Sequence, residues 1–293
     1  QAGLPLISPS NTAPALTSPA DHTATYLRTS PNDRIQGRVD ANFARLALRG
    51  ERAATLATPT PYPSALAKVF ADAFRENGGT VVATASFDVG ASPAAAVAEV
   101  AAAGPDIVFV PVQGVQACND TIGALRAEAR LAAARIITAD GCQSAGTLDA
   151  LKGRPGPPVF ASGPDSSAVQ GNAFYAQEFL PAYTALYGTA PTSVWHPNAF
   201  DAASMLFDAV RRAARIQGDG SIVIRKRALM RALYETDGYD GLSGVLECRS
   251  TGDCAQSARI SLYAAPAWPV SGGDPNATAV FTQKVTLADA LSG

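Results

Sequence analysis

Residues 51–112 read ERAATLATPTPYPSALAKVFADAFRENGGTVVATASFDVGASPAAAVAEVAAAGPDIVFVPV, and two patterns alternate along them. Residues 53–58 and 80–87 are short apolar runs bounded by turn residues, which predicts strands. Residues 64–76 instead repeat apolar side chains at helical spacing and end before Gly78, which predicts a helix. A strand, a helix and a second strand joined by short connections are typical of a parallel sheet covered by helices.

The same alternation extends from residue 33 to residue 162. The expected strands are residues 53–58, 80–87, 106–112, 135–139 and 159–162, and the expected helices are residues 33–48, 64–76, 92–104, 115–132 and 143–151. This alternation predicts an α/β fold with a doubly wound, mostly parallel sheet.

The rest of the chain has a different character. We expect long helices at residues 168–187, 197–216 and 226–234, strands at 244–247 and 258–263, a loop-rich tail at 266–278 and an apolar segment at 279–287. Residues 1–30 contain one apolar run, residues 4–8, so they cannot form a sheet alone. These parts predict a second unit that is rich in helices and poor in strands.

The composition of the 293 residues excludes several classes of protein. Lys and Arg number 23 against 25 Asp and Glu, so no basic surplus is available to bind nucleic acid or anionic lipid. No continuous apolar run of about 18–20 residues is present, which excludes a membrane-spanning helix within the sequence. Since domains contain roughly 100–200 residues, the length predicts about two of them.

Four cysteines predict two disulfides. Cys248 and Cys254 flank a turn with Ser-Thr-Gly-Asp at its centre, which favours a disulfide across a hairpin. Cys118 and Cys142 each follow an apolar strand, and they can bond if the two strands are neighbours. Two disulfides would indicate an oxidising compartment, the periplasm or the extracellular space. The alternative is four reduced, buried cysteines in a cytosolic protein.

Signatures of catalysis are absent from the sequence. It contains no G-x-S-x-G elbow, no phosphate-binding G-x-x-x-x-G-K-[ST] loop and no G-x-G-x-x-G fingerprint. It also contains no C-x-x-C pair, and its only histidines are His22 and His196. We therefore expect neither an enzyme, nor a cofactor, nor a metal site.

Three landmarks point to a family. Residues 4–17, LPLISPSNTAPALT, precede YLRTSPND at residues 26–33 and a Gln36-Gly37 pair. Residues 198–202 read NAFDA, and residues 239–246 read YDGLSGVL before a later Gly-Asp pair. In type, order and spacing, these segments resemble the periplasmic leucine/isoleucine/valine-binding protein family, the type I solute-binding proteins of ABC importers. Tyr239 stands where the family has phenylalanine.

The resemblance implies a two-lobe type I periplasmic binding protein fold, in which each lobe has a doubly wound, mostly parallel sheet. Three crossings between the lobes are expected near residues 28–32, 162–165 and 237–244. Lobe 1 would then comprise residues 1–30 and 165–240, and lobe 2 residues 31–164 and 241–293. Family members carry a long stretch before the first landmark, so we expect the first strands of lobe 1, and a signal peptide or lipid anchor, to be missing here.

The resemblance also implies where a ligand would bind. In the family, the segment that corresponds to Ser10 and Thr12 contacts an amino-acid carboxylate, here through the Thr12 hydroxyl and the Ser10 backbone. Both residues follow an apolar strand and precede an expected helix start at Ala13-Pro14, where hydroxyls and N–H groups can bind an anion. The alternative is that they only cap the helix.

An acidic residue of the family pairs with the ligand's ammonium group, and Asp140 corresponds to it. Asp140 follows the expected strand 135–139, at the carboxyl end where ligands bind in open parallel sheets. If it binds the ligand, the ligand carries a cationic group. The alternative is an ordinary Asp-Gly turn with Gly141.

Two further residues are candidates. Tyr62 corresponds to a family tyrosine that covers the ligand from lobe 2, although Pro63 replaces the glycine that follows it in the family. Gln113 ends the expected strand 106–112, where relatives often have an aromatic residue, and it either favours a polar ligand or bonds its neighbours. Trp195 and His196 precede the expected helix at Pro197 and could face the cleft between the lobes, but we favour a hydrophobic staple for Trp195 and a solvated side chain for His196.

The sequence thus predicts a substrate-binding protein of an ABC importer. We expect the permease subunits of the importer to recognise it, and we expect it to bind its ligand without catalysing a reaction. The expected ligand is a small polar molecule, most simply a branched-chain or related amino acid, and the expected state is a monomer in the periplasm or outside the cell. The alternative is the extracellular ligand-binding module of a receptor with the same fold, for a metabolite other than an amino acid.

Overall fold

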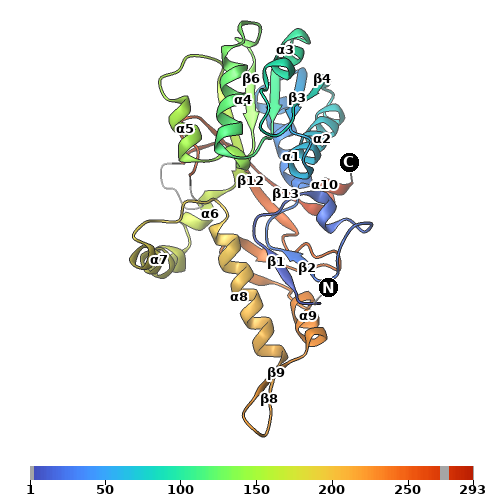
Figure 1. Ribbon diagram of the computed structural model, residues 1–293, viewed down its shortest axis with the longest axis vertical. Helices are drawn as coiled ribbons and strands as arrows, with labels where there is room; N and C mark the ends of the chain where they lie inside the picture. Colours follow the sequence, from blue (N-terminus) through green and yellow to red (C-terminus); the bar gives the residue numbers. More distant parts are fainter. Residues whose placement is uncertain (1–2, 271–276, 293) are drawn as a thin grey trace.

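Seven strands form the sheet of one lobe, which we call the large lobe (Figure 1). The computed structural model describes residues 3–270 and 277–292. The strands are β3 (Arg52–Ala57), β4 (Thr80–Ser86), β5 (Ile107–Val110), β6 (Arg135–Thr138), β7 (Val159–Pro164), β12 (Ser257–Ala264) and β13 (Ala279–Thr286). Their order is β13-β12-β7-β6-β5-β3-β4. The strands from β7 to β4 are parallel, while β12 and β13 pair antiparallel at one edge.

Helices cover both faces of this sheet. One face packs against α1 (Asp33–Asn42), α2 (Pro61–Glu76) and α10 (Leu287–Leu291), and the other against α3 (Ala94–Ala102), α4 (Val115–Ala127) and α5 (Ala145–Leu151). In β5, Ile107 and Phe109 face the first layer and Val108 and Val110 the second. An uninterrupted Ile-Val-Phe-Val run fits a strand buried on both faces. The predicted doubly wound α/β sheet is confirmed.

A second group of elements forms the small lobe. They are β1 (Leu6–Ser8), η1 (Pro14–Thr17), β2 (Tyr26–Arg28), α6 (Ser166–Gln170), η5 (Tyr175–Phe179), α7 (Leu180–Tyr187), α8 (His196–Ala213), β8 (Ala214–Ile216), β9 (Ile222–Ile224), α9 (Lys226–Tyr234), β10 (Tyr239–Gly241) and β11 (Gly244–Leu246). The parallel sheet of this lobe has two described strands, β1 and β2. Its core joins Leu27 of β2 to Met205 of α8 and Leu233 of α9.

The helices of the small lobe differ from two expectations. The single helix expected at residues 168–187 is broken, because Asn172 Oδ1 accepts a 2.9 Å hydrogen bond from Tyr175 N–H and starts a new helical segment. The helix expected at 197–216 ends at Ala213, and its last three residues form β8, which pairs antiparallel with β9. Gly220, with a φ of +83°, allows the turn between these two strands.

The chain crosses between the lobes three times. The first two crossings follow β2 and β7. The third does not lie at residues 237–244, because β10 and β11 pair with each other and Leu246, Cys248 and Cys254 pack against Leu27 in the core of the small lobe. The chain enters the large sheet only at Ser257, so residues 241–256 pack with the small lobe.

Both predicted disulfides are present. Cys118 of α4 bonds to Cys142, which ends the short turn η4 (Asp140–Cys142), and the strands that precede them, β5 and β6, are neighbours in the sheet. Cys248 bonds to Cys254 across the predicted turn. Within residues 3–270 and 277–292, no helix has the length and apolar character needed to cross a membrane. Part of the expected loop-rich tail, residues 271–276, lies outside the described residues.

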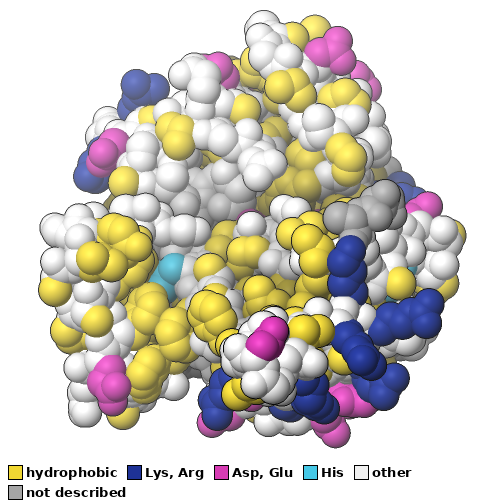
Figure 2. All heavy atoms as spheres, turned by 60° about the horizontal axis from the view of Figure 1, so that its bottom comes forward, with side chains coloured by type: hydrophobic (Ala, Val, Ile, Leu, Met, Phe, Trp, Pro, Cys, Tyr) yellow, Lys and Arg dark blue, Asp and Glu magenta, His cyan; other side chains and the backbone are white. Residues whose placement is uncertain are grey.

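An aromatic cluster links η5 to the start of α8. The ring centroids of Tyr175 and Phe179 lie 5.4 Å apart, and Phe179 stacks on His196 at 5.7 Å. Figure 2 shows hydrophobic side chains gathered over this part of the small lobe, at the left of the view. Leu186 and Tyr187 of α7 are largely exposed there. These ring contacts hold η5, and α7 that continues from it, against α8.

Candidate functional site

A cavity of about 950 Å³ lies between the two lobes. All five residues predicted to bind a ligand line it, and they come from both sides. Its wall in the small lobe includes Ser10 and Thr12, and its wall in the large lobe includes Tyr62, Gln113 and Asp140. Three of the five lie just beyond the carboxyl ends of β3, β5 and β6, where a parallel sheet places its ligands.

Asp140 is the charged group at the centre of the large-lobe wall. Its Oδ1 accepts a 2.9 Å hydrogen bond from Gln36 Nε2 of α1 and a 3.1 Å hydrogen bond from the Tyr62 hydroxyl. Burial raises the pKa of Asp140, although these hydrogen bonds and one from Trp195 oppose the increase. The residue does begin a short turn with Gly141, but its carboxylate lines the cavity as well.

The loop that carries Asp140 is closely packed. A Cβ atom at Gly141 would lie 2.7 Å from the carbonyl oxygen of Val112, so only glycine fits between the two loops. Gly114 N–H donates a 3.2 Å hydrogen bond to the carbonyl of Gly141, and the Cys118–Cys142 disulfide joins the same two segments. The loops that follow β5 and β6 are therefore held together, which fixes Gln113 relative to Asp140.

Two further carboxylates lie behind this wall. Asp33 and Asp40 share one face of α1 with Gln36, and both are buried. Burial and the charge of Asp140 raise the pKa of Asp33 to about 8, while Thr12 and Arg28 oppose the increase. Burial also raises the pKa of Asp40 well above its ordinary value. The wall around Asp140 thus contains several carboxyl groups whose charged form a positive charge in the cavity would stabilise.

The small-lobe wall is an irregular loop after β1. Thr12 is buried and Ser10 is exposed to the cavity. The helix expected after Ala13 is a single turn, η1, and no side chain caps it. Ser10 and Thr12 therefore do not serve as helix caps, which removes the alternative interpretation of these residues.

Tyr62 lies in the first turn of α2, which begins at Pro61, three residues before the expected start. Proline is tolerated in a first turn because the N–H groups there have no partner within the helix. Pro61 and Pro63 thus extend α2 toward the cavity, and the substitution of Pro63 for the family's glycine leaves Tyr62 facing Asp140. Gln113 is exposed at the cavity wall.

The sequence interpretation missed several neighbours of the site. Trp195, for which the staple was favoured over a position facing the cleft, lines the cavity, and its side chain helps to lower the pKa of Asp140. Tyr26 lines the small-lobe side. His196, interpreted as solvated, is half-buried in the aromatic cluster, where Nε2 lies 3.0 Å from the Tyr175 hydroxyl and burial lowers its pKa. The sequence signal for the cavity position of Trp195 was its place directly before a helix with proline in its first turn.

The described part of the chain holds no group of three or more His, Cys, Asp or Glu side chains arranged to bind a metal ion. What the site offers is hydrogen-bonding and charged groups on two facing walls. Such an arrangement can hold a small polar molecule between lobes that close by a hinge motion.

The model of a family described as periplasmic binding protein matches residues 1–260. The chain belongs to the periplasmic binding protein family. This family consists of solute-binding proteins, and the family expected from the sequence is confirmed. Comparison with curated proteins finds no significant match.

Solved structures of periplasmic binding proteins share the fold. The leucine-binding protein LivK of Thermotoga maritima superposes with a TM-score of 0.76 at 20% identity, over 98% of this chain and 74% of that one. LivJ of Streptococcus pneumoniae, in complex with isoleucine, gives 0.67 at 21% identity, over 97% and 73%. An ABC-transporter solute-binding protein of R. palustris, in complex with benzoate, gives 0.68 at 19% identity, over 89% and 68%.

Proposed function

We propose that this protein is the solute-binding component of an ABC importer and that it binds an amino acid between its two lobes. The observation that carries the proposal is the facing position of Asp140 on one cavity wall and Thr12 on the other. A zwitterion presents an ammonium group and a carboxylate at opposite ends of a short unit. The two walls supply a carboxylate for the first and hydroxyl and N–H groups for the second.

The charges of the cavity support an amino acid over a simple aromatic acid such as benzoate, which the R. palustris protein binds. A ligand that carries only a negative charge would oppose ionisation of Asp140 and of the buried Asp33 behind it, and it would form no ion pair with either. An ammonium group next to Asp140 would instead favour the charged carboxylate and pair with it. Tyr26, Tyr62 and Trp195 surround the remaining space with aromatic surface, which suits an apolar or aromatic side chain.

The partners follow from the same proposal. Permease subunits would recognise the closed form, in which Ser10 and Asp140 contact one ligand from opposite lobes. The two disulfides support a location in an oxidising compartment, the periplasm or the extracellular space. We propose that the protein acts there as a monomer.

The test is a panel of the twenty amino acids, with benzoate as a comparison, measured by thermal shift and then by isothermal titration calorimetry. We expect one class of amino acids to raise the melting temperature, since a ligand that binds only the folded state stabilises it. Asp140→Asn and Thr12→Ala should each weaken that ligand at least tenfold, which is about 1.4 kcal/mol.

Asp120→Asn, which changes an exposed aspartate of α4 outside the cavity, is the matched control and should bind as the wild type does. Unchanged affinity in both cavity variants would refute the assignment of the site. A shift with benzoate and with no amino acid would refute the ligand class.

A further inference from the structure

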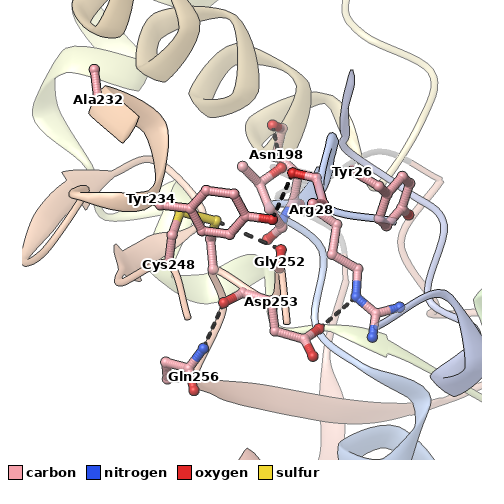
Figure 3. The surroundings of a disulfide bond; sticks show 12 residues. Tyr26, Arg28, Asn198, Ala232, Tyr234, Cys248, Gly252, Asp253 and Gln256 are labelled. Carbon is pink, nitrogen blue, oxygen red and sulfur yellow. Dashed lines mark hydrogen bonds and ion pairs between the residues drawn. A yellow bond between two sulfur atoms is a disulfide. The ribbon is translucent and has the colours of Figure 1, made fainter. Parts of the chain in front are cut away.

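Arg28, at the end of β2, is buried completely and uses its guanidinium in four hydrogen bonds. Nε donates to Asp253 Oδ1 at 2.6 Å, an ion pair that Figure 3 shows beside the Cys248–Cys254 disulfide. The other two nitrogens donate to the loop after β1, at the carbonyl oxygens of Asn11 and Ala13 and the hydroxyl of Thr17. One buried charge thus connects the disulfide turn with the loop that lines the cavity.

The bond to Asn11 determines the direction of the neighbouring N–H group. In a trans peptide, the C=O of one residue and the N–H of the next point in opposite directions. Because the Asn11 carbonyl faces Arg28, at 3.1 Å, the Thr12 N–H points away from Arg28. The Thr12 carbonyl is also held, since it accepts a 3.0 Å hydrogen bond from Asp33 N–H. Thr12 itself lines the cavity.

Asp253 is held by the turn that the disulfide closes. Within that turn, Arg249 N–H donates to the Asp253 carbonyl at 2.9 Å and Gly252 N–H donates to the Arg249 carbonyl at 2.8 Å. Gln256 Nε2 also donates to the Asp253 carbonyl, at 2.7 Å, as Figure 3 shows.

The backbone of the turn is joined directly to β2 at Arg28. Arg28 N–H donates to the Gly252 carbonyl and Cys254 N–H donates to the Arg28 carbonyl. A Cβ atom at Gly252, whose φ is +85°, would lie 2.3 Å from the carbonyl oxygen of Tyr26. Only glycine therefore fits at position 252, where the turn packs directly against the backbone of β2.

We infer that Arg28 is a positioning residue for the ligand-binding loop, residues 10–13, and that the Cys248–Cys254 disulfide acts on this loop through Asp253. This inference rests on the proposed function. Arg28, Asp253 and the two cysteines do not themselves line the cavity. A buried ion pair contributes little net stability, because the cost of removing both charges from water offsets their attraction. What the pair provides is a fixed direction for the carbonyl of Asn11, and hence for the Thr12 N–H group offered to a ligand carboxylate.

The decisive variant is Asp253→Asn, which keeps the shape of the side chain and removes the charge that holds Arg28. The first measurement is amide hydrogen exchange of residues 10–17 in the ligand-free protein. We expect exchange there to become at least tenfold faster, while exchange in the large-lobe sheet stays unchanged. The second measurement compares the Kd of leucine with that of leucinamide, which has the ammonium group but no carboxylate. The variant should lose at least tenfold in affinity for leucine and less than twofold for leucinamide.

The change in this ratio separates positioning from a general loss of structure, which would weaken both ligands equally. Asp165→Asn is the matched control, because Asp165 also pairs with an arginine, Arg259, at 2.7 Å but lies at the second crossing. It should leave both the exchange of residues 10–17 and the leucine-to-leucinamide ratio unchanged. If another amino acid proves to be the ligand, its own amide replaces leucinamide.

Two further variants cover the case in which Asp253→Asn does not fold. Gln256→Ala removes one hydrogen bond to Asp253, and the double variant Cys248→Ser, Cys254→Ser opens the turn; both should accelerate exchange of residues 10–17. Wild-type exchange in all folded variants would overturn the inference. A wild-type protein that binds no amino acid would overturn the proposed function alone, because the exchange measurement needs no ligand.

Discussion

The hydroxyl of Tyr62 lies 3.1 Å from Oδ1 of Asp140 and donates a hydrogen bond to it. The bond joins the first turn of α2 to the loop after β6, two segments that are 78 residues apart in the sequence. Gln36 donates to the same oxygen, so the position and the charge of Asp140 both depend on residues from neighbouring helices.

Tyr62→Phe should weaken binding of the amino acid about five- to tenfold, because a hydrogen bond to a charged group contributes about 1.5 kcal/mol or less when one donor of two remains. Loss of this donor also raises the pKa of Asp140 further. Affinity falls when Asp140 becomes protonated as the pH is lowered. Calorimetry between pH 5 and pH 8 should therefore show that this loss of affinity begins at a higher pH in the variant than in the wild type. Tyr183→Phe, in the aromatic cluster, is the control and should change neither quantity.

Ligand binding should release protons near neutral pH. The ammonium group would stabilise the charged forms of Asp140 and Asp33, and so lower the pKa of each, which is about 8 for Asp33 without ligand. Groups that hold a proton before binding then lose it. Calorimetry in buffers with different ionisation enthalpies measures the number of protons released. Uptake of protons, or no dependence on the buffer, would contradict this account of the acidic wall.

Asp33→Asn should stabilise the protein at high pH. The ordinary pKa of 3.8 rises to about 8 in the folded state, so between these values the folded protein binds more protons than the unfolded chain. The free energy of unfolding therefore decreases as pH rises through this window. The amide resembles the protonated carboxyl and removes this dependence. Urea unfolding at pH 5 and pH 8 should show a gain over the wild type only at pH 8.

Exposed Asp120→Asn provides the comparison for that experiment and should leave the slope of stability against pH unchanged. A lower stability of Asp33→Asn at pH 8 would mean that the carboxylate is charged and stabilised in the folded protein.

Removal of the Cys118–Cys142 disulfide should cost more stability than removal of Cys248–Cys254. The first closes a sequence separation of 24 residues and the second one of 6. Chain-entropy arguments give roughly 3.5 kcal/mol for the longer loop and roughly 1 kcal/mol less for the shorter one. Chemical denaturation of the two Cys→Ser double variants, each against the oxidised wild type, measures the difference. Equal losses would show that strain or packing, rather than loop closure, determines the contribution of each bond.

The large-lobe sheet could be predicted from the sequence because its strands and helices have strong local patterns. The run Ile107–Val110 is apolar throughout, and such a run fits only a strand covered on both faces. The five ligand residues could be placed by the family motif together with the rule that loops at the carboxyl ends of parallel strands meet. Their convergence on one cavity is a structural observation, and their role in binding remains a prediction.

Other features depend on contacts that no local pattern encodes. Asp33 and Asp40 look like solvated helix positions until the sheet covers them, so their raised pKa values could not be predicted. The third crossing was misplaced because the hairpin of β10 and β11 could pair within either lobe. The packing of Leu246, Cys248 and Cys254 with Leu27 in one core decides between them. Trp195 was assigned to a staple rather than to the cleft because a tryptophan before a helix has the same local pattern whether it packs on the helix or faces a cavity.

The hairpin of β8 and β9 extends from the bottom of the molecule in Figure 1 and pairs with no other described strand. Ile216 and Ile222 are 78% and 66% exposed on it. Both outer edges of this ribbon carry backbone groups free to join a second edge, and β-branched side chains favour such a pairing. This ribbon is therefore the part of the described chain where a second strand edge would be accepted most readily. Val223→Lys would add a charge to the ribbon and oppose such a pairing.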